Sequence, residues 1–194
     1  MLAATWRAFR SRPERYSMPV HDQPHIVLPQ APDGTRTVRQ SQSEYSEICL
    51  PNDANLLGNM LGGHVMHLVD LCGAIAGIRH ARCMVVTASI DQMTFLHPIR
   101  VGELVQLKSQ VNRVFRTSME VGVKVWVENL QSGTLRHTSS AYLTFVGLDN
   151  AGNKVILPQI VPESGDEKRR YEEAAERRAY RLAFKDKTRR TQHP

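Results

Sequence analysis

Alternating apolar and polar residues in the second half of the chain predict β-strands. The clearest run, residues 118–128, turns one apolar set of side chains toward one face: Met119, Val121, Val123, Val125 and Val127. Residues 103–114 and 134–148 show the same two-residue period, and Gly133 marks a turn before the last run. These three segments are therefore expected to form long neighbouring strands.

Two further strands are expected earlier in the chain. Residues 44–50 form a short first strand that Pro51 ends. Residues 83–99 are rich in β-branched residues and form a long strand with a bend near Asp91. This strand and the three after it are expected to pair in sequence order as a four-stranded antiparallel meander.

Between these first two strands lies the one long apolar helix. Residues 51–63 are crowded with Pro, Asn, Asp and Gly, which predicts a turn-rich loop. From His64 to about Arg82, apolar residues occupy nearly every side of a helix, which predicts a helix buried all round. Its second half contains Gly73 and Gly77, so another element is expected to approach its backbone closely.

The fold class that this order predicts is α+β. A long sheet with one apolar face and a single apolar helix to cover it favours a curved, five-stranded antiparallel sheet wrapped around that helix. Residues 1–40 are interpreted as an extended or disordered arm, 41–165 as the folded domain, and 166–194 as a charged C-terminal helix and tail. Exposed sheet edges favour self-association.

The charge distribution argues against nucleic acid as a partner. The net charge is +6, but the excess of basic residues lies in the two tails and the central part of the chain is close to neutral. No apolar run reaches the roughly 18 residues that span a bilayer. The three cysteines show no metal-type spacing, and Cys72 on the apolar helix is expected to have a raised pKa. We expect a cytoplasmic protein, with an organellar matrix as the alternative that the Arg-rich N-terminus suggests.

Asp70 is the residue that does not fit the apolar helix. Removing an isolated carboxylate from water costs several kcal/mol, so Asp70 needs a partner or a chemical role. One interpretation is a structural hydrogen bond, for example to His67. The other uses the N–H groups at the start of the helix, those of Gly63 and His64, to polarise a carbonyl while Asp70 activates water.

Several segments together resemble one known family. PNDANLLGNMLGGHVMHLVD, RHA, VVTASIDQMTFLHPIRVGELV, RTSMEVGVKVWVEN and SSAYLTFVGLDNAGNKVILPQIVP look like the hotdog-fold acyl-CoA thioesterases, and the likeness extends over about residues 44–180. The resemblance implies the hotdog fold and hydrolysis of fatty acyl-CoA to free fatty acid and CoA. It implies no cofactor, since coenzyme A is part of the substrate.

The resemblance also implies site residues and an assembly. The helix aspartate, matching Asp70, acts from one protomer, and the loop asparagine, matching Asn55, acts from the other. CoA docks near the turn that matches Arg116, Thr117 and Ser118. Family members commonly assemble as trimers of dimers. The family often has Gly before this turn, whereas this chain has Phe115, so the turn is expected to differ.

Three alternatives remain open at this stage. A hotdog enoyl-CoA hydratase would need a positioned His with a carboxylate. A non-catalytic acyl-CoA-binding module would need neither. A metal site could use His64, His67 and Asp70, but each three-residue step turns about 60° away from the previous position on a helix, so the three converge poorly. No metal is therefore expected.

Overall fold

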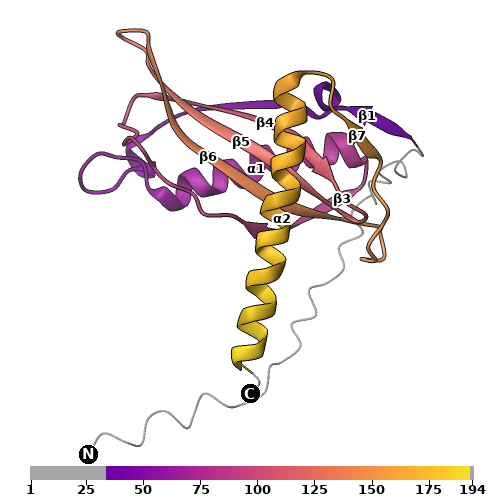
Figure 1. The fold of residues 1–194 in the computed structure, drawn as a ribbon. Coiled ribbons are helices and arrows are strands. Elements are labelled where there is room, and N and C mark those ends of the chain that lie inside the picture. The colour runs from indigo at the N-terminus through magenta and orange to yellow at the C-terminus, as the bar shows by residue number, and fades with distance from the viewer. Residues whose placement is uncertain (1–33, 193–194) are drawn as a thin grey trace, which may run out of the picture.

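The centre of the molecule is a five-stranded antiparallel sheet with the strand order β2-β4-β5-β6-β3. The computed structural model describes residues 34–192, with side chains up to residue 184. The strands of this sheet are β2 (Ser43–Ile48), β3 (Met84–Ile90), β4 (Leu104–Val114), β5 (Ser118–Asn129) and β6 (Thr134–Leu148). Helix α1 (Gly62–Ala81) lies in the curl of the sheet, and α2 (Gly165–Gln192) crosses the outer face (Figure 1). The predicted curved sheet, its long helix and its C-terminal helix are confirmed.

The predicted meander is right for three strands and wrong for one. β4, β5 and β6 pair in sequence order, but β3 pairs with β6 at the far edge and not with β4. β3 also ends at Ile90, so the second half of the predicted long strand is an irregular crossing segment. In that segment, Leu96 donates its N–H to the Thr138 carbonyl at 2.9 Å. Alternation shows which residues face the core but not which strands are neighbours, and this is why the prediction failed.

Some short elements were not predicted. β1 (Thr35–Thr37) and β7 (Gln159–Val161) form a separate two-stranded parallel sheet. Two 3₁₀-helices, η1 (Val38–Ser41) and η2 (Pro51–Asp53), precede β2 and α1. The part of the predicted N-terminal arm before residue 34, including the possible organellar presequence, lies outside the described residues.

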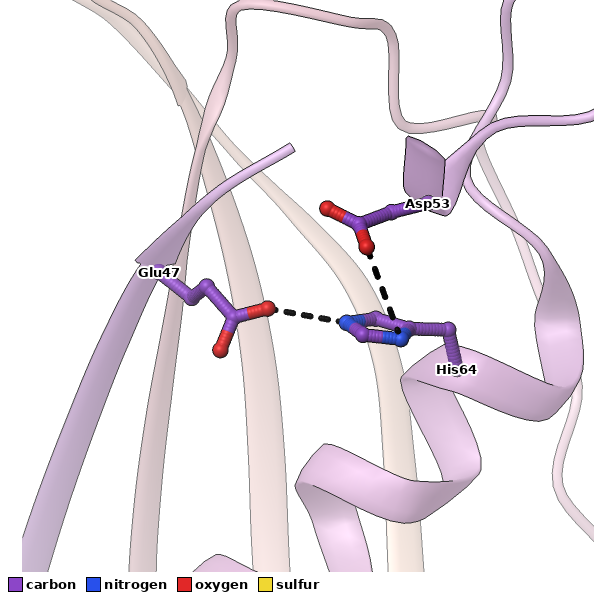
Figure 2. A group of neighbouring side chains, drawn as sticks. All are labelled: Glu47, Asp53 and His64. Atoms are coloured by element: carbon purple, nitrogen blue, oxygen red, sulfur yellow. Dashed lines mark hydrogen bonds and ion pairs between the residues drawn. The ribbon is translucent and has the colours of Figure 1, made fainter. Parts of the chain in front are cut away.

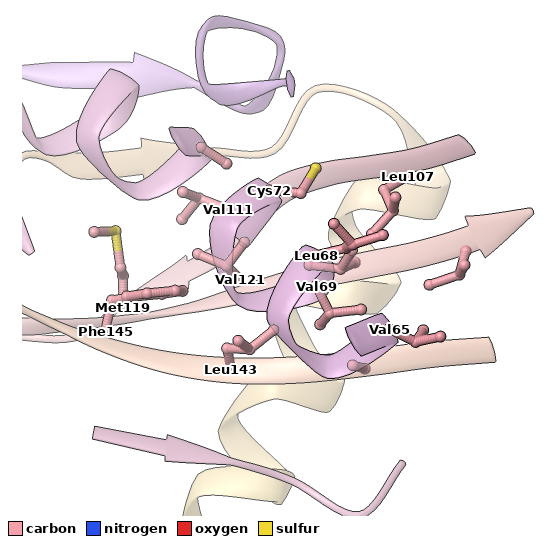
Figure 3. Close-up of a cluster of buried hydrophobic side chains, with 14 of the residues drawn as sticks. Val65, Leu68, Val69, Cys72, Leu107, Val111, Met119, Val121, Leu143 and Phe145 are labelled. Carbon is pink, nitrogen blue, oxygen red and sulfur yellow. The ribbon is translucent and has the colours of Figure 1, made fainter. Parts of the chain in front are cut away.

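The core lies between α1 and the concave face of the sheet (Figure 3). The alternating apolar residues of β5 and β6 point inward as predicted, and Met119 and Phe145 are fully buried. A Cβ atom at Gly73 would lie 3.2 Å from the Phe145 ring, and one at Gly77 would lie 3.0 Å from the end of Met119. The predicted close approach to the second half of the helix is therefore confirmed, because a Cβ atom at either position would make the neighbouring side chain shift.

One side of α1 is not covered, so the prediction of a helix buried all round is wrong for the single chain. Met66, Leu71 and Ile78 are 43%, 38% and 38% exposed. Exposed apolar side chains continue on the neighbouring edge strand β3, at Met84 and Val86. The apolar residues of α1 therefore form two faces. One face packs against the sheet, and the other is exposed to solvent in the isolated chain.

A buried ion-pair cluster holds α2 on the outer face of the sheet. Glu120 of β5 is fully buried, and Arg177 of α2 donates to both of its carboxylate oxygens, at 2.7 and 3.2 Å. Arg181 adds a contact to Glu120 at 3.3 Å and one to Asp91 at 2.6 Å. The Arg177 guanidinium also stacks over the Tyr142 ring, 3.7 Å from its centroid. Charge pairing therefore fixes the docking of the predicted charged C-terminal helix.

Neither described helix combines the length with the apolar character that crossing a membrane requires.

Buried His80 gives a stability prediction. Its Nε2 lies 2.8 Å from the Pro158 carbonyl oxygen, and burial, with a smaller contribution from the Arg36 charge, lowers the pKa of His80. The unfolded chain therefore binds a proton more readily than the folded chain. We expect full stability above about pH 6.5 and a loss of stability as the pH falls below that value. In urea unfolding, His80→Gln should weaken this dependence on pH, whereas His97→Gln in an exposed loop should not. Equal pH dependence in wild type and His80→Gln would contradict the assignment.

Candidate active site

The carboxylate of Asp70 is held by a hydroxyl group on the edge strand. Thr87 of β3 donates its Oγ1–H to Asp70 Oδ1 at 2.6 Å. Asp70 is half-buried rather than removed from water, which corrects the picture of an acid lodged in an apolar interior. His67, the partner that one interpretation gave it, is exposed and makes no described hydrogen bond to Asp70. This hydrogen bond orients one carboxylate oxygen and leaves Oδ2 without a partner among the described residues.

Thr87 was missed in the sequence. It stands in a run of apolar and β-branched residues, where a threonine is an ordinary strand residue. The pairing of β3 with β6 shifts register between Thr87 and Ser89, which marks a local irregularity at this point of the strand. Only the placement of β3 beside the third turn of α1 shows that this hydroxyl belongs to Asp70.

Asn55 lies at the tip of an exposed, closed hairpin. Its Oδ1 accepts the N–H groups of Leu57 at 2.9 Å and Asn59 at 3.2 Å. Its backbone N–H donates to the Asn59 carbonyl at 2.8 Å. The Asn55 side-chain NH₂ group has no partner among the described residues and is available as a donor. No described contact joins Asn55 to Asp70 within the chain.

The start of α1 offers fewer free donors than predicted. The helix begins at Gly62, and the N–H of His64 donates to the Leu61 carbonyl at 2.9 Å. The His64 amide therefore already has an acceptor, and its role as an oxyanion donor stays a prediction. The N–H groups of Gly62 and Gly63 have no acceptor among the described residues, and a Cβ at Gly63 would meet open space. Gly63 remains a predicted donor at the positive end of the helix dipole.

The His64 side chain, in contrast, makes specific contacts. Its Nε2 lies 2.8 Å from Glu47 Oε1 and its Nδ1 lies 3.9 Å from Asp53 Oδ1 (Figure 2). Hydrogen bonds from His64 and, secondly, from Tyr45 lower the pKa of the Glu47 carboxyl group. The described groups that could together approach a metal ion are thus Glu47, Asp53 and His64. The trio with His67 and Asp70 that the sequence spacing suggested is not brought together.

The turn after β4 lies at a cavity of about 590 Å³ beside α2. Thr117 and Ser118 line this cavity, together with Lys154 and Arg178, whereas Arg116 is exposed and does not line it. Arg178 donates to Ser118 Oγ at 3.4 Å. The structure therefore joins two of the three predicted CoA-contact residues to three cations that the sequence did not single out, namely Lys154, Arg178 and Arg181, of which Arg181 is already paired with Asp91 and Glu120.

Phe115 takes an ordinary backbone conformation in this turn. Arg82 is the one non-glycine residue with positive φ in the described chain, so Phe115 does not adopt the left-handed conformation that a glycine would allow. Its N–H donates to the Ser118 carbonyl at 2.8 Å, and its ring packs under the Arg178 guanidinium at 4.1 Å. Phe115 thereby holds a cation at the mouth of the cavity.

Cys72 is not a candidate nucleophile. It is fully buried, its thiol donates to Ser109 Oγ at 3.2 Å, and burial raises its pKa, as the sequence led us to expect.

Comparison with known proteins gives the family. Residues 57–134 match the model of the thioesterase superfamily. The chain is 38% identical over 146 residues to acyl-coenzyme A thioesterase 11 of Mus musculus, and the match spans 75% of this chain but only 24% of that protein. It is 38% identical over 133 residues to an uncharacterised acyl-CoA thioester hydrolase, YkhA, of Bacillus subtilis, and here the match spans 69% of this chain and 77% of the relative.

Solved structures agree with the sequence matches. An acyl-CoA hydrolase from Staphylococcus aureus, solved with butyryl-CoA, CoA and CoA disulfide, superposes with a TM-score of 0.76 at 32% identity, over 81% of this chain and 96% of that one. A hexameric acyl-CoA thioesterase in its apo form gives a TM-score of 0.75 at 37% identity, over 77% and 96% of the two chains.

Three alanine variants of the Staphylococcus aureus enzyme were also solved, at one asparagine, one aspartate and one threonine. The intervals between those three positions equal the intervals between Asn55, Asp70 and Thr87 here. Together with the matching fold, these findings show that the chain belongs to the thioesterase superfamily, among its hotdog-fold acyl-CoA hydrolases.

Proposed function

We propose that the protein hydrolyses fatty acyl-CoA thioesters to free fatty acid and CoA, in a site that two copies of the chain complete. The observation that carries this proposal is the Asp70 carboxylate, held through one oxygen by Thr87 on the side of α1 that the sheet leaves uncovered. A carboxylate fixed in this way is a base or nucleophile with a free oxygen.

In the chemical step, Asp70 takes a proton from water as the water oxygen attacks the thioester carbonyl carbon. Attack by Asp70 itself, giving an anhydride that water then opens, uses the same geometry. The developing oxyanion accepts a hydrogen bond from the Gly63 N–H, and the free NH₂ group of Asn55 orients the carbonyl or the water. The C–S bond then breaks, and CoA leaves as a thiolate.

The position of Asn55 supports a site shared between copies. A helix rises about 1.5 Å per residue, so the seven residues from Gly63 to Asp70 span about 10 Å along α1. A thioester carbonyl and the water that attacks it can bridge this distance, because a helix side chain points toward the helix N-terminus. Asn55, in contrast, makes its described contacts within its own hairpin and none with Asp70, so Asn55 of one copy is free to act with Asp70 of another.

The uncovered surface fits such self-association. The exposed residues Met66, Leu71 and Ile78 of α1 continue onto β3, whose outer edge has no strand partner within the described chain. Burying this surface against a second copy removes apolar area from water and satisfies the free edge. We infer a dimer and, in line with the hexameric relative, a trimer of dimers.

The cavity beside α2 suits the phosphates of CoA. Lys154 and Arg178 supply positive charge, and the hydroxyl groups of Thr117 and Ser118 supply further donors. The proposed reaction needs no cofactor or metal. A cytoplasmic location fits the relative named the cytosolic acyl coenzyme A thioester hydrolase of Homo sapiens.

The central test is hydrolysis of palmitoyl-CoA, followed by thiol release. Asp70→Asn and Asn55→Ala should each lower kcat, by about 10²- to 10⁴-fold for Asp70 because it loses its base, with the oligomer unchanged by light scattering. Asp166→Asn, at an exposed helix start, is the matched control. Full activity of either site variant removes that residue from the mechanism. Wild-type protein that binds palmitoyl-CoA without releasing thiol would indicate a binding module, and hydration of crotonyl-CoA would indicate a hydratase.

Thr87→Val should lower kcat by about 10- to 100-fold, because hydrogen bonds to charged groups contribute about 1.5–3 kcal/mol. The substitution keeps the side-chain shape, so the melting temperature should change little. Thr134→Val, at an exposed end of β6, serves as the control for a lost threonine hydroxyl. Unchanged kcat in Thr87→Val would show that Asp70 needs no hydroxyl to orient it.

Arg178→Gln should raise KM for acyl-CoA by about 5- to 10-fold and leave kcat nearly unchanged, because the phosphates lie away from the reacting carbonyl. The KM for an acyl-pantetheine, a substrate analogue that lacks the nucleotide, should be the same for Arg178→Gln and wild type. Arg169→Gln, on the same helix but paired with exposed acidic residues, is the control. An equal KM effect for both substrates would contradict phosphate binding at Arg178.

A further inference from the structure

His64 connects the active-site helix to two other elements of the chain. Its imidazole ring lies between a carboxylate of β2 and a carboxylate of η2, with Nε2 toward Glu47 and Nδ1 toward Asp53 (Figure 2). All three side chains are partly shielded, with exposed fractions between 18% and 28%. The 2.8 Å hydrogen bond between His64 and Glu47 is therefore less exposed to competition from water than a bond on the open surface.

Asp53 stands at the base of the hairpin that carries Asn55. Its carbonyl accepts the N–H of Leu61 at 2.8 Å, and this bond closes the loop just before α1 begins. Its Oδ2 accepts the N–H of Leu50 at 2.9 Å, which leaves Oδ1 facing His64. Asp53, just before the hairpin, is therefore held by one hydrogen bond to its backbone carbonyl and one to its side chain.

Glu47 gives the other anchor. Its Oε2 accepts the Tyr45 hydroxyl at 2.7 Å, so the carboxylate cannot rotate away from His64 without losing that bond. Because Glu47 belongs to the sheet, the His64 ring has a fixed reference point in the core of the fold.

We propose that His64 is a positioning residue for hydrolysis, which holds the Asn55 hairpin at a set place relative to α1 and β2. This inference rests on the function proposed for Asn55. An asparagine that reaches the site of a second copy has to be placed by its own chain, and the His64 bridge does this from outside the hairpin. Displacement of such a group by about 1 Å is enough to slow a reaction strongly.

A metal ion is the other occupant that suits this cluster. Glu47, Asp53 and His64 each offer one ligand atom, and these atoms lie within 4.8 Å of one another. The 2.8 Å separation of His64 Nε2 and Glu47 Oε1 is that of a direct hydrogen bond, which favours a bridge without an ion.

The kinetic signature separates positioning from substrate binding. The cavity with Thr117 and Ser118 belongs to the turn after β4 and shares no residue with the His64 cluster. Loss of the bridge should therefore lower kcat while the KM for acyl-CoA stays within about twofold. A general loss of structure would change both values and the melting temperature.

The experiment compares His64→Leu, His64→Gln and Glu47→Gln with wild type in the palmitoyl-CoA assay. His64→Leu, which has no donor, should lower kcat by about 10-fold. His64→Gln, which keeps an amide donor toward Glu47, should recover part of that loss. Glu44→Gln, on the same strand and paired with Lys108 at 3.3 Å on the surface, is the matched control and should keep wild-type kcat. Melting temperatures should stay within about 2 °C of wild type.

A double-mutant cycle with Asn55→Ala decides the assignment. In the Asn55→Ala background, His64→Leu should cause no further loss of kcat, because the residue that it positions is already absent. The same loss in both backgrounds would overturn the inference, as would wild-type kcat for His64→Leu while Asn55→Ala is impaired. Full activity of Asn55→Ala would instead refute the role proposed for Asn55 itself. Activity that EDTA removes and Zn²⁺ restores would show that the cluster is a metal site.

Discussion

The structure depends on the contact between one side of α1 and the concave face of the sheet. Gly73 and Gly77 allow Phe145 and Met119 to approach the helix backbone closely, and this fixes both the depth and the rotation of α1. Its rotation then decides what the opposite side presents, namely Asp70 and a strip of exposed apolar residues. Packing that looks purely structural thus places the carboxylate that we propose as the base at a partly exposed surface.

The residues that we propose for thioester hydrolysis lie on different elements, and each is held in place in a different way. Asp70 lies on the central helix and is oriented from the edge strand by Thr87. Asn55 lies on a hairpin that its own side chain closes. No described contact joins Asn55 to Asp70 within the chain, so we propose that two chains bring them together. The strip of exposed apolar residues on α1 and β3 lowers the solubility of a monomer, but in a dimer it would bring these groups together.

Ion pairs hold α2 on the outer face of the sheet, whereas apolar packing holds α1 on the inner face. Glu120 is fully buried there, and Arg177 and Arg181 of α2 neutralise it. Removal of either arginine would leave part of a buried negative charge uncompensated, which is why such clusters make docking specific. Because this pairing fixes α2, it also fixes Arg178, one residue further along, at the mouth of the cavity that we assign to the phosphates.

The sequence by itself determined the long helix, the alternating strands and the odd position of Asp70, because periodicity and composition are local properties. Its resemblance to a family supplied Asn55 and the turn at Thr117 and Ser118. Only the tertiary structure decided that β3 lies beside β6, since strand order depends on contacts between distant segments. That placement brings Thr87 to Asp70. The structure likewise decided that the His64 amide donates to Leu61 while its side chain hydrogen-bonds Glu47 and lies 3.9 Å from Asp53, because such contacts follow from three-dimensional proximity and not from spacing in the chain.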